Sequence, residues 1–337
     1  MKSEATEKKR LFVFLGIAFL LPYALGILMG YGYYKGVDVS AFPNAQMFYP
    51  AAGVMLAVLL IKREGELVPK RFYIGFVGMT AIMMLLAVAS VFIPGMWIMA
   101  AVNLVIIIGS LTLWIFLLTE KKEKRRACGL CLGKGKQSVW MVVLFLIFYI
   151  GRIVVSCAVS GGMQELAAMF QTPYTYIMMV SLAINFFLVF AAFFGEEYGW
   201  RYYFAPLLQK HFGKKAGVLL LGVLWGLWHL PINVFYYSPD TWLQSVVSQQ
   251  ITCISLGIFF TYAYEKSGTI WVPVILHMLN NNLIAVFSGG DATVLNNQII
   301  TWPDVAVALV INAVCFLPFL FTKELKENEE LQKGIQN

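Results

Sequence analysis

Apolar runs long enough to cross a lipid bilayer recur along this chain of 337 residues. A run of about 20 apolar residues is typical of a transmembrane helix. Only 13% of the residues are charged and 60% are hydrophobic, whereas a soluble domain carries about 25% charged residues. The sequence therefore predicts an all-α fold, a polytopic transmembrane helical bundle of about ten spans. The runs lie at roughly 11–30, 46–61, 72–93, 96–118, 138–160, 173–198, 216–236, 246–264, 270–288 and 302–322.

The basic residues are distributed unevenly between these spans. If the N-terminus is cytoplasmic, the basic segments fall on the cytoplasmic side, with Arg201 counted among them, and the outside loops hold Lys35. Cytoplasmic loops of membrane proteins carry the excess of Lys and Arg. Both termini and the loop Glu120 to Gln137 are therefore predicted to be cytoplasmic. This placement accounts for the net charge of +7, so we expect the lipid bilayer as a partner and no nucleic acid.

Arg152 falls in the middle of the fifth span. It could snorkel to the membrane surface, or the boundary of the span could be shifted. We expect instead a structural ion pair with a carboxylate inside the membrane.

Two adjacent carboxylates, Glu196 and Glu197, follow an apolar run that carries no charge from Ile177 to Phe194. Ionisable residues inside a membrane segment are a functional hypothesis by default. On a helix, Glu197 and Arg201 are four residues apart in the orientation that favours an ion pair. Glu196 points roughly 100° away from Glu197. One carboxylate is thus expected to pair with arginine while the other stays free for chemistry; the alternative is a helix end at which all three side chains are solvated.

Two of the three histidines lie within apolar spans. His229 and Glu196 are nearly equidistant from a turn expected near Phe212, so an antiparallel hairpin places them at one level. Asn281 lies one helical turn beyond His277, on the same face. The four groups can therefore converge, and we expect them in the cytoplasmic half of the membrane. Pro231 should kink the helix of His229.

This set of side chains suits hydrolysis of an acyl bond. A buried carboxylate can act as the general base on water, and a neutral imidazole can share that role or orient the water. A second imidazole and a side-chain amide can donate hydrogen bonds to the oxyanion. The sequence shows no recognisable serine or cysteine nucleophile motif and no H-E-x-x-H zinc motif. A divalent metal such as zinc stays open, with Glu196, His229 and His277 as its ligands.

Three motifs resemble a known family. They are Glu-Glu-x-x-x-Arg at Glu196 to Arg201, aromatic-x-x-x-His at Trp225 to His229, and His-x-x-x-Asn at His277 to Asn281. Their order and spacing are similar to those of the CAAX-processing and bacteriocin-processing intramembrane proteases, over about residues 140 to 290. The resemblance implies that Glu196 and His229 activate water, that His277 and Asn281 form the oxyanion hole, and that Glu197 and Arg201 brace the site. The family usually has Phe where this chain has Trp225, which we interpret as a packing residue.

The resemblance implies an intramembrane endopeptidase acting on a membrane-associated protein or peptide. It suggests an N-terminal four-span membrane region at 1–137, a catalytic core at 138–290, and a last span with a polar cytoplasmic tail at 291–337. By analogy with the family, we expect an integral protein of a bacterial plasma membrane. The alternatives are an ion-coupled transporter that uses the buried Glu and His as a proton relay, and a non-proteolytic scaffold or immunity factor on the same fold.

Overall fold

The computed structural model describes residues 2–288 and 292–326, so the expected boundary at 290 and most of the polar tail lie outside the described residues. The described residues form helices and no strand, which confirms the all-α prediction. The N-terminal part comprises α1 (Lys2–Leu15), the π-helical η1 (Gly16–Leu20), α2 (Leu21–Tyr34), α3 (Ala41–Gln46), α4 (Tyr49–Leu60), α5 (Lys70–Phe92), α6 (Trp97–Leu118) and α7 (Lys122–Ala127).

The remainder of the chain continues the bundle. It comprises α8 (Gly135–Ser160), α9 (Met163–Gln171), α10 (Pro173–Glu197), the π-helical η2 (Tyr198–Phe204), α11 (Ala205–Phe212), α12 (Lys214–Trp228), α13 (Leu230–Ile232) and the π-helical η3 (Asn233–Tyr237). The short η4 (Pro239–Thr241), α14 (Trp242–Ser267), α15 (Trp271–Phe287), η5 (Ala292–Leu295), α16 (Trp302–Phe316), η6 (Leu317–Phe321) and η7 (Lys323–Leu325) follow.

Eight helices in the described part of the chain are long and apolar enough to cross a membrane, or nine if the bent pair of α12 with the residues Leu230–Tyr237 counts as one span. This confirms a polytopic bundle with slightly fewer spans than the sequence suggested. The difference lies at α15, which has 17 residues. At 1.5 Å per residue such a helix is about 25 Å long, shorter than the roughly 30 Å hydrocarbon core.

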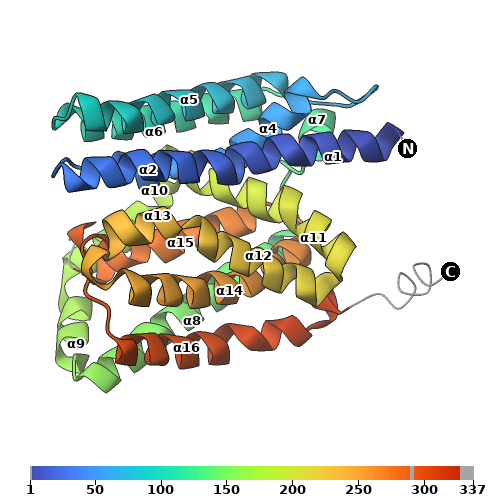
Figure 1. Ribbon diagram of the computed structural model, residues 1–337. Helices are drawn as coiled ribbons and strands as arrows, with labels where there is room; N and C mark the ends of the chain where they lie inside the picture. The colour runs from blue at the N-terminus through green and yellow to red at the C-terminus, as the bar shows by residue number, and fades with distance from the viewer. Residues whose placement is uncertain (1, 289–291, 327–337) are drawn as a thin grey trace.

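Helix α10 lies at the centre of the bundle and packs against α4, α6 and α15. In Figure 1, α5 and α6 form one edge and α16 forms the opposite edge, with α10 and α12 to α15 between them. Glycines allow the central helix to approach its neighbours closely. A Cβ atom on Gly195 would collide with the Met47 carbonyl oxygen, and one on Gly199 would collide with Pro50. The start of α4 therefore crosses the carboxylate-bearing stretch in direct backbone contact.

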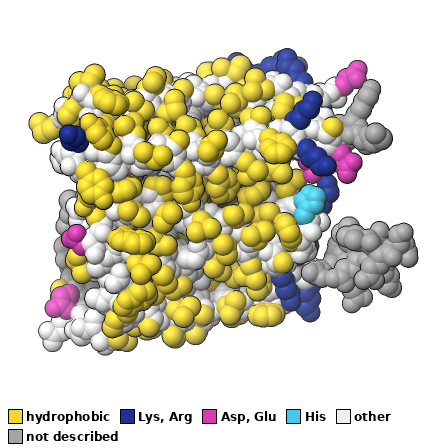
Figure 2. Space-filling view, viewed as in Figure 1, with side chains coloured by type: hydrophobic (Ala, Val, Ile, Leu, Met, Phe, Trp, Pro, Cys, Tyr) yellow, Lys and Arg dark blue, Asp and Glu magenta, His cyan; other side chains and the backbone are white. Residues whose placement is uncertain are grey.

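The two ends of the bundle differ in charge. Lys and Arg side chains gather at the end where α1 begins, and apolar side chains cover much of the visible face (Figure 2). The first turn of α1 and the last described turn, η7, lie at this same end (Figure 1). Counting Arg201 among the solvated basic residues was wrong, because its side chain is fully buried. The span does not end at Glu197; it continues through η2 into α11.

We predict that the Lys- and Arg-rich end faces the cytoplasm, as positively charged loops do. A reporter protein fused after Lys124 should then be located in the cytoplasm. The same reporter fused after Gly36 should be located on the opposite side of the membrane. Localisation of both reporters on one side of the membrane would contradict this orientation.

We predict that Gly195→Ala destabilises the protein by roughly 1–3 kcal/mol, the usual cost of overpacking. The new methyl group would meet the backbone of Met47, which cannot move aside like a flexible side chain. Gly78→Ala in α5 is a matched control, because a Cβ atom there meets nothing within 4 Å. Thermal melting in detergent should show a lower midpoint for Gly195→Ala alone; equal midpoints for the two variants would refute the close crossing.

Candidate active site

A cavity of about 420 Å³ inside the bundle brings together the four residues that the sequence singled out for chemistry, Glu196, His229, His277 and Asn281. They come from α10, the break after α12, and α15. The cavity reaches toward the end of the bundle opposite the basic end, where Asn44 precedes α4 and where the segment between α15 and α16 contributes Leu295 and Gln298. Residues distant in sequence therefore share one compartment.

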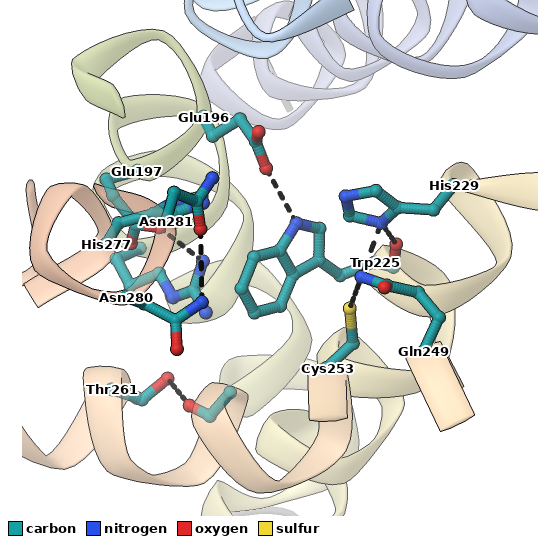
Figure 3. Close-up of polar contacts among 12 residues, drawn as sticks. Glu196, Glu197, Trp225, His229, Gln249, Cys253, Thr261, His277, Asn280 and Asn281 are labelled. Atoms are coloured by element: carbon teal, nitrogen blue, oxygen red, sulfur yellow. Dashed lines mark hydrogen bonds and ion pairs between the residues drawn. The ribbon is translucent and has the colours of Figure 1, made fainter. Parts of the chain in front are cut away.

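The Glu196 carboxylate is 2% exposed and forms part of the cavity wall. Trp225 Nε1 donates a hydrogen bond to its Oε2 atom at 2.8 Å. Figure 3 shows the indole of Trp225 between Glu196 and His229. The interpretation of Trp225 as a packing residue was therefore incomplete. The one-turn spacing to His229 was the available signal, because it places the two side chains on the same side of the chain at the end of α12.

Glu197 points into a separate charged cluster. Arg201 Nη1 donates to Glu197 Oε1 at 3.0 Å, and His277 Nδ1 lies 2.7 Å from the same oxygen. The side chains of Glu197 and Arg201 are fully buried. The Arg201 guanidinium also lies 4.2 Å from the ring centroid of Trp225 and 5.2 Å from that of Phe260. The ion pair between Glu197 and Arg201 is the one that helical spacing predicts, and the structure adds His277 as its third member.

The ring of His229 stands where its helix breaks. The axis bends by 41° between Trp228 and Leu230, as expected from Pro231, which lacks the N–H that would bond the Leu227 carbonyl. That carbonyl instead accepts a hydrogen bond of 2.6 Å from the Tyr23 hydroxyl of α2. The adjacent Trp228 carbonyl accepts one of 2.8 Å from Gln46 Nε2 of α3.

The two ring nitrogens of His229 have different hydrogen-bonding roles. His229 Nδ1 lies 2.8 Å from the Trp225 carbonyl oxygen. A carbonyl can only accept, so Nδ1 carries the proton and Nε2 keeps its lone pair. His229 therefore presents a hydrogen-bond acceptor.

Asn281 has a neighbour that fixes its amide. Asn280 Nδ2 donates to Asn281 Oδ1 at 3.0 Å, and both residues line the cavity. Since the oxygen of Asn281 is engaged, its NH₂ group is the end available to a ligand. Sequence reasoning did not single out Asn280, although the run of three asparagines from Asn280 to Asn282 in an apolar helix was the signal.

Among residues 2–288 and 292–326, no carboxylate forms the ion pair that the sequence led us to expect for Arg152. Its Nη1 atom donates to the neutral Asn312 Oδ1 at 2.9 Å. Arg152 is also part of the cavity lining. Asn312 lies on α16, 160 positions further along the chain, and an amide so distant could not be recognised as its partner from the sequence.

The N-terminal region, for which the motifs gave no role, reaches the cavity. Pro43, Asn44 and Met47 form part of its wall. These residues lie in α3 and in the turn before α4. Together with Tyr23 and Gln46, they connect the first spans to the surroundings of His229.

A metal centre was left open by the sequence, with Glu196, His229 and His277 as ligands. Across residues 2–288 and 292–326, no group of three or more His, Cys, Asp and Glu side chains is placed to hold a metal ion.

We predict that Arg201→Ala destabilises the protein by about 3–5 kcal/mol, because it leaves the Glu197 carboxylate buried without its cation. Lys210→Ala is the control, since it breaks an exposed ion pair with Glu7 that is worth about 0–1 kcal/mol. Thermal melts and the yield of folded protein should both fall for Arg201→Ala and stay near wild type for Lys210→Ala. An unchanged melting temperature for Arg201→Ala would contradict the bracing role.

Comparison with known proteins supports the motif resemblance. Residues 176–283 match the family model described as type II CAAX prenyl endopeptidase Rce1-like. The chain is 32% identical over 113 residues to CAAX prenyl protease 2 of Methanococcus maripaludis, a match that covers 31% of this chain and 41% of that protein. No solved structure matches the chain. The matched segment contains Glu196, His229, His277 and Asn281. The chain therefore contains, within its membrane bundle, a segment that matches the Rce1-like CAAX prenyl endopeptidase family model.

Proposed function

We propose that this integral membrane protein is an intramembrane endopeptidase that hydrolyses a peptide bond of a membrane-associated protein or peptide. The observation that carries the proposal is one cavity inside a bundle of membrane-length helices. Its lining includes Glu196, His229, His277 and Asn281. The match to a CAAX endopeptidase family model over the same helices supports it.

Water activation falls to Glu196 and His229. Trp225 holds one oxygen of the Glu196 carboxylate, so the second oxygen is the one free to accept a proton from water. His229 Nε2 is an acceptor because Nδ1 is committed to the Trp225 carbonyl. A water molecule bound between the two groups would lose its proton to the carboxylate as its oxygen attacks the peptide carbon.

Stabilisation of the oxyanion falls first to Asn281. Its NH₂ group can donate in any state of the site, because its oxygen is held by Asn280. His277 differs, since its Nδ1 faces the Glu197 carboxylate. In the neutral ring that contact leaves Nε2 without a proton, so His277 donates to an oxyanion only as the imidazolium.

The parts of the chain have distinct roles in this proposal. Residues 138–290 form the catalytic core, the four-span region at 1–137 closes one wall of the cavity, and residues 291–337 add the last span and a tail on the cytoplasmic side. We place the protein in a bacterial plasma membrane, by analogy with the family.

We predict that Glu196→Gln lowers turnover by roughly 10²–10⁴-fold, the usual contribution of a positioned general base. The amide has nearly the same shape and carries no charge, so the melting temperature should stay near that of wild type. The assay is cleavage of internally quenched peptides by the purified protein in detergent.

Glu165→Gln is the control, because Glu165 is an exposed carboxylate on α9. It should cleave at the wild-type rate. Near-normal cleavage by Glu196→Gln would refute the assignment of the base. His229→Ala should resemble Glu196→Gln, and the double variant should lose little more, because groups that act as a unit are not additive.

A further inference from the structure

Among the described residues, two formally charged side chains line the cavity, Glu196 and Arg152. Glu196 has a role in the proposed hydrolysis. Arg152 has none, although it comes from α8 and reaches the same compartment. A guanidinium on a membrane helix is costly and is usually paired or placed on a substrate pathway.

The contacts of Arg152 differ from those of two buried arginines. Arg10 and Arg201 are each paired with a glutamate, at 2.5 Å and 3.0 Å respectively. Among the described residues no carboxylate pairs with Arg152, and its hydrogen-bond partner is the neutral Asn312 oxygen at 2.9 Å. The Arg152 cation therefore lines the cavity without a carboxylate of the described residues bonded to it.

The geometry around Arg152 holds the guanidinium in place. Asn312 Nδ2 donates to the Ala308 carbonyl at 2.8 Å, which orients the amide oxygen toward Arg152. The guanidinium carbon lies 5.4 Å from the ring centroids of both Tyr149 and Phe316, within the range of a cation–π contact. Of the five N–H donors of a guanidinium, one is committed to Asn312. The other N–H groups can donate two parallel hydrogen bonds to a planar anion such as a carboxylate.

We propose that Arg152 is a carboxylate-binding subsite of the cavity, which fixes a peptide substrate by an anionic group to one side of the bond to be cleaved. The proposal rests on the proposed peptidase function. The carboxylate is either the free C-terminus of the peptide or the side chain of an Asp or Glu residue. Arg152 is a binding residue in this account, because it offers the same contact to the substrate before and during the reaction. Its loss should therefore raise KM and leave kcat unchanged.

The test measures binding separately from catalysis. Full-length Glu196→Gln protein, which is expected to bind without cleaving, is titrated in nanodiscs with three fluorescent peptides of otherwise identical, neutral sequence. One has a free C-terminal acid, one has a C-terminal amide, and one has a C-terminal amide with an internal Asp. Fluorescence anisotropy gives Kd for each peptide, and thermal melts report the fold.

We expect at least one acidic peptide to bind roughly 10–100-fold more tightly than the neutral amide, as for a hydrogen bond to a charged group. The acidic peptide that shows the preference identifies the source of the carboxylate. Adding Arg152→Gln should abolish the preference and leave binding of the neutral peptide unchanged. Arg152→Lys should retain part of it, because the charge remains but the two-pronged geometry does not. Arg71→Gln, which removes an exposed arginine at the start of α5, should leave it intact.

Equal affinities for the acidic and neutral peptides, or a preference that persists in Arg152→Gln, would overturn the subsite. If Arg152→Gln does not fold, the comparison of acidic with neutral peptides on the Arg152→Lys background still decides the matter. An Arg152-dependent preference in a protein whose wild type cleaves none of the peptides would support the subsite and count against the proposed peptidase. In an active enzyme, Arg152→Gln should raise KM by the same roughly 10–100-fold for the acidic peptide only, at constant kcat.

Discussion

A carboxylate cannot remain charged in the interior of a membrane bundle unless other groups balance it, and the Glu197 side chain illustrates how much structure that requirement fixes. Its Oε1 atom is shared by Arg201 and His277, so one buried anion ties α10 and η2 to α15. Breaking such a contact leaves an uncompensated charge, which is far more costly than losing an exposed pair. The cluster thereby sets the orientation of the His277 ring at the cavity wall, while the neighbouring Glu196 is left to face the cavity.

The tautomers inferred from the hydrogen bonds refine the division of labour implied by the motifs. Both histidines direct Nδ1 toward an acceptor, the Trp225 carbonyl for His229 and the Glu197 carboxylate for His277. Their Nε2 atoms consequently act as acceptors when the rings are neutral. This suits His229 as a partner of Glu196 in handling water. For His277 it makes the oxyanion role conditional on protonation, so Asn281 is the donor available in every state.

The sequence predicted the features that depend on short spacings. Helical phase separated Glu196 from Glu197 and paired the latter with Arg201, and Pro231 indicated the bend at His229. The features that it could not predict join residues far apart in the chain. The hydrogen bond from Trp225 to Glu196 depends on how two helices face each other, and the contact of Arg152 with Asn312 spans 160 positions. The extent of the Glu196 span was also misjudged, because π-helical turns carry it onward without a break in composition.

The hydrogen bonds from Tyr23 and Gln46 have a consequence for biosynthesis. Their acceptors at the bend beside His229 lie 204 and 182 positions later in the chain, so the donors are translated long before the broken helix. A carbonyl without a hydrogen bond costs several kcal/mol in hydrocarbon. When this helix is synthesised, the segments that carry its donors, Tyr23 and Gln46, have already been translated. A truncated gene that began at residue 138 would encode all three motifs. It would lack the donors to the Leu227 and Trp228 carbonyls beside His229. The first spans thus complete the hydrogen bonding of the helix that carries the histidine.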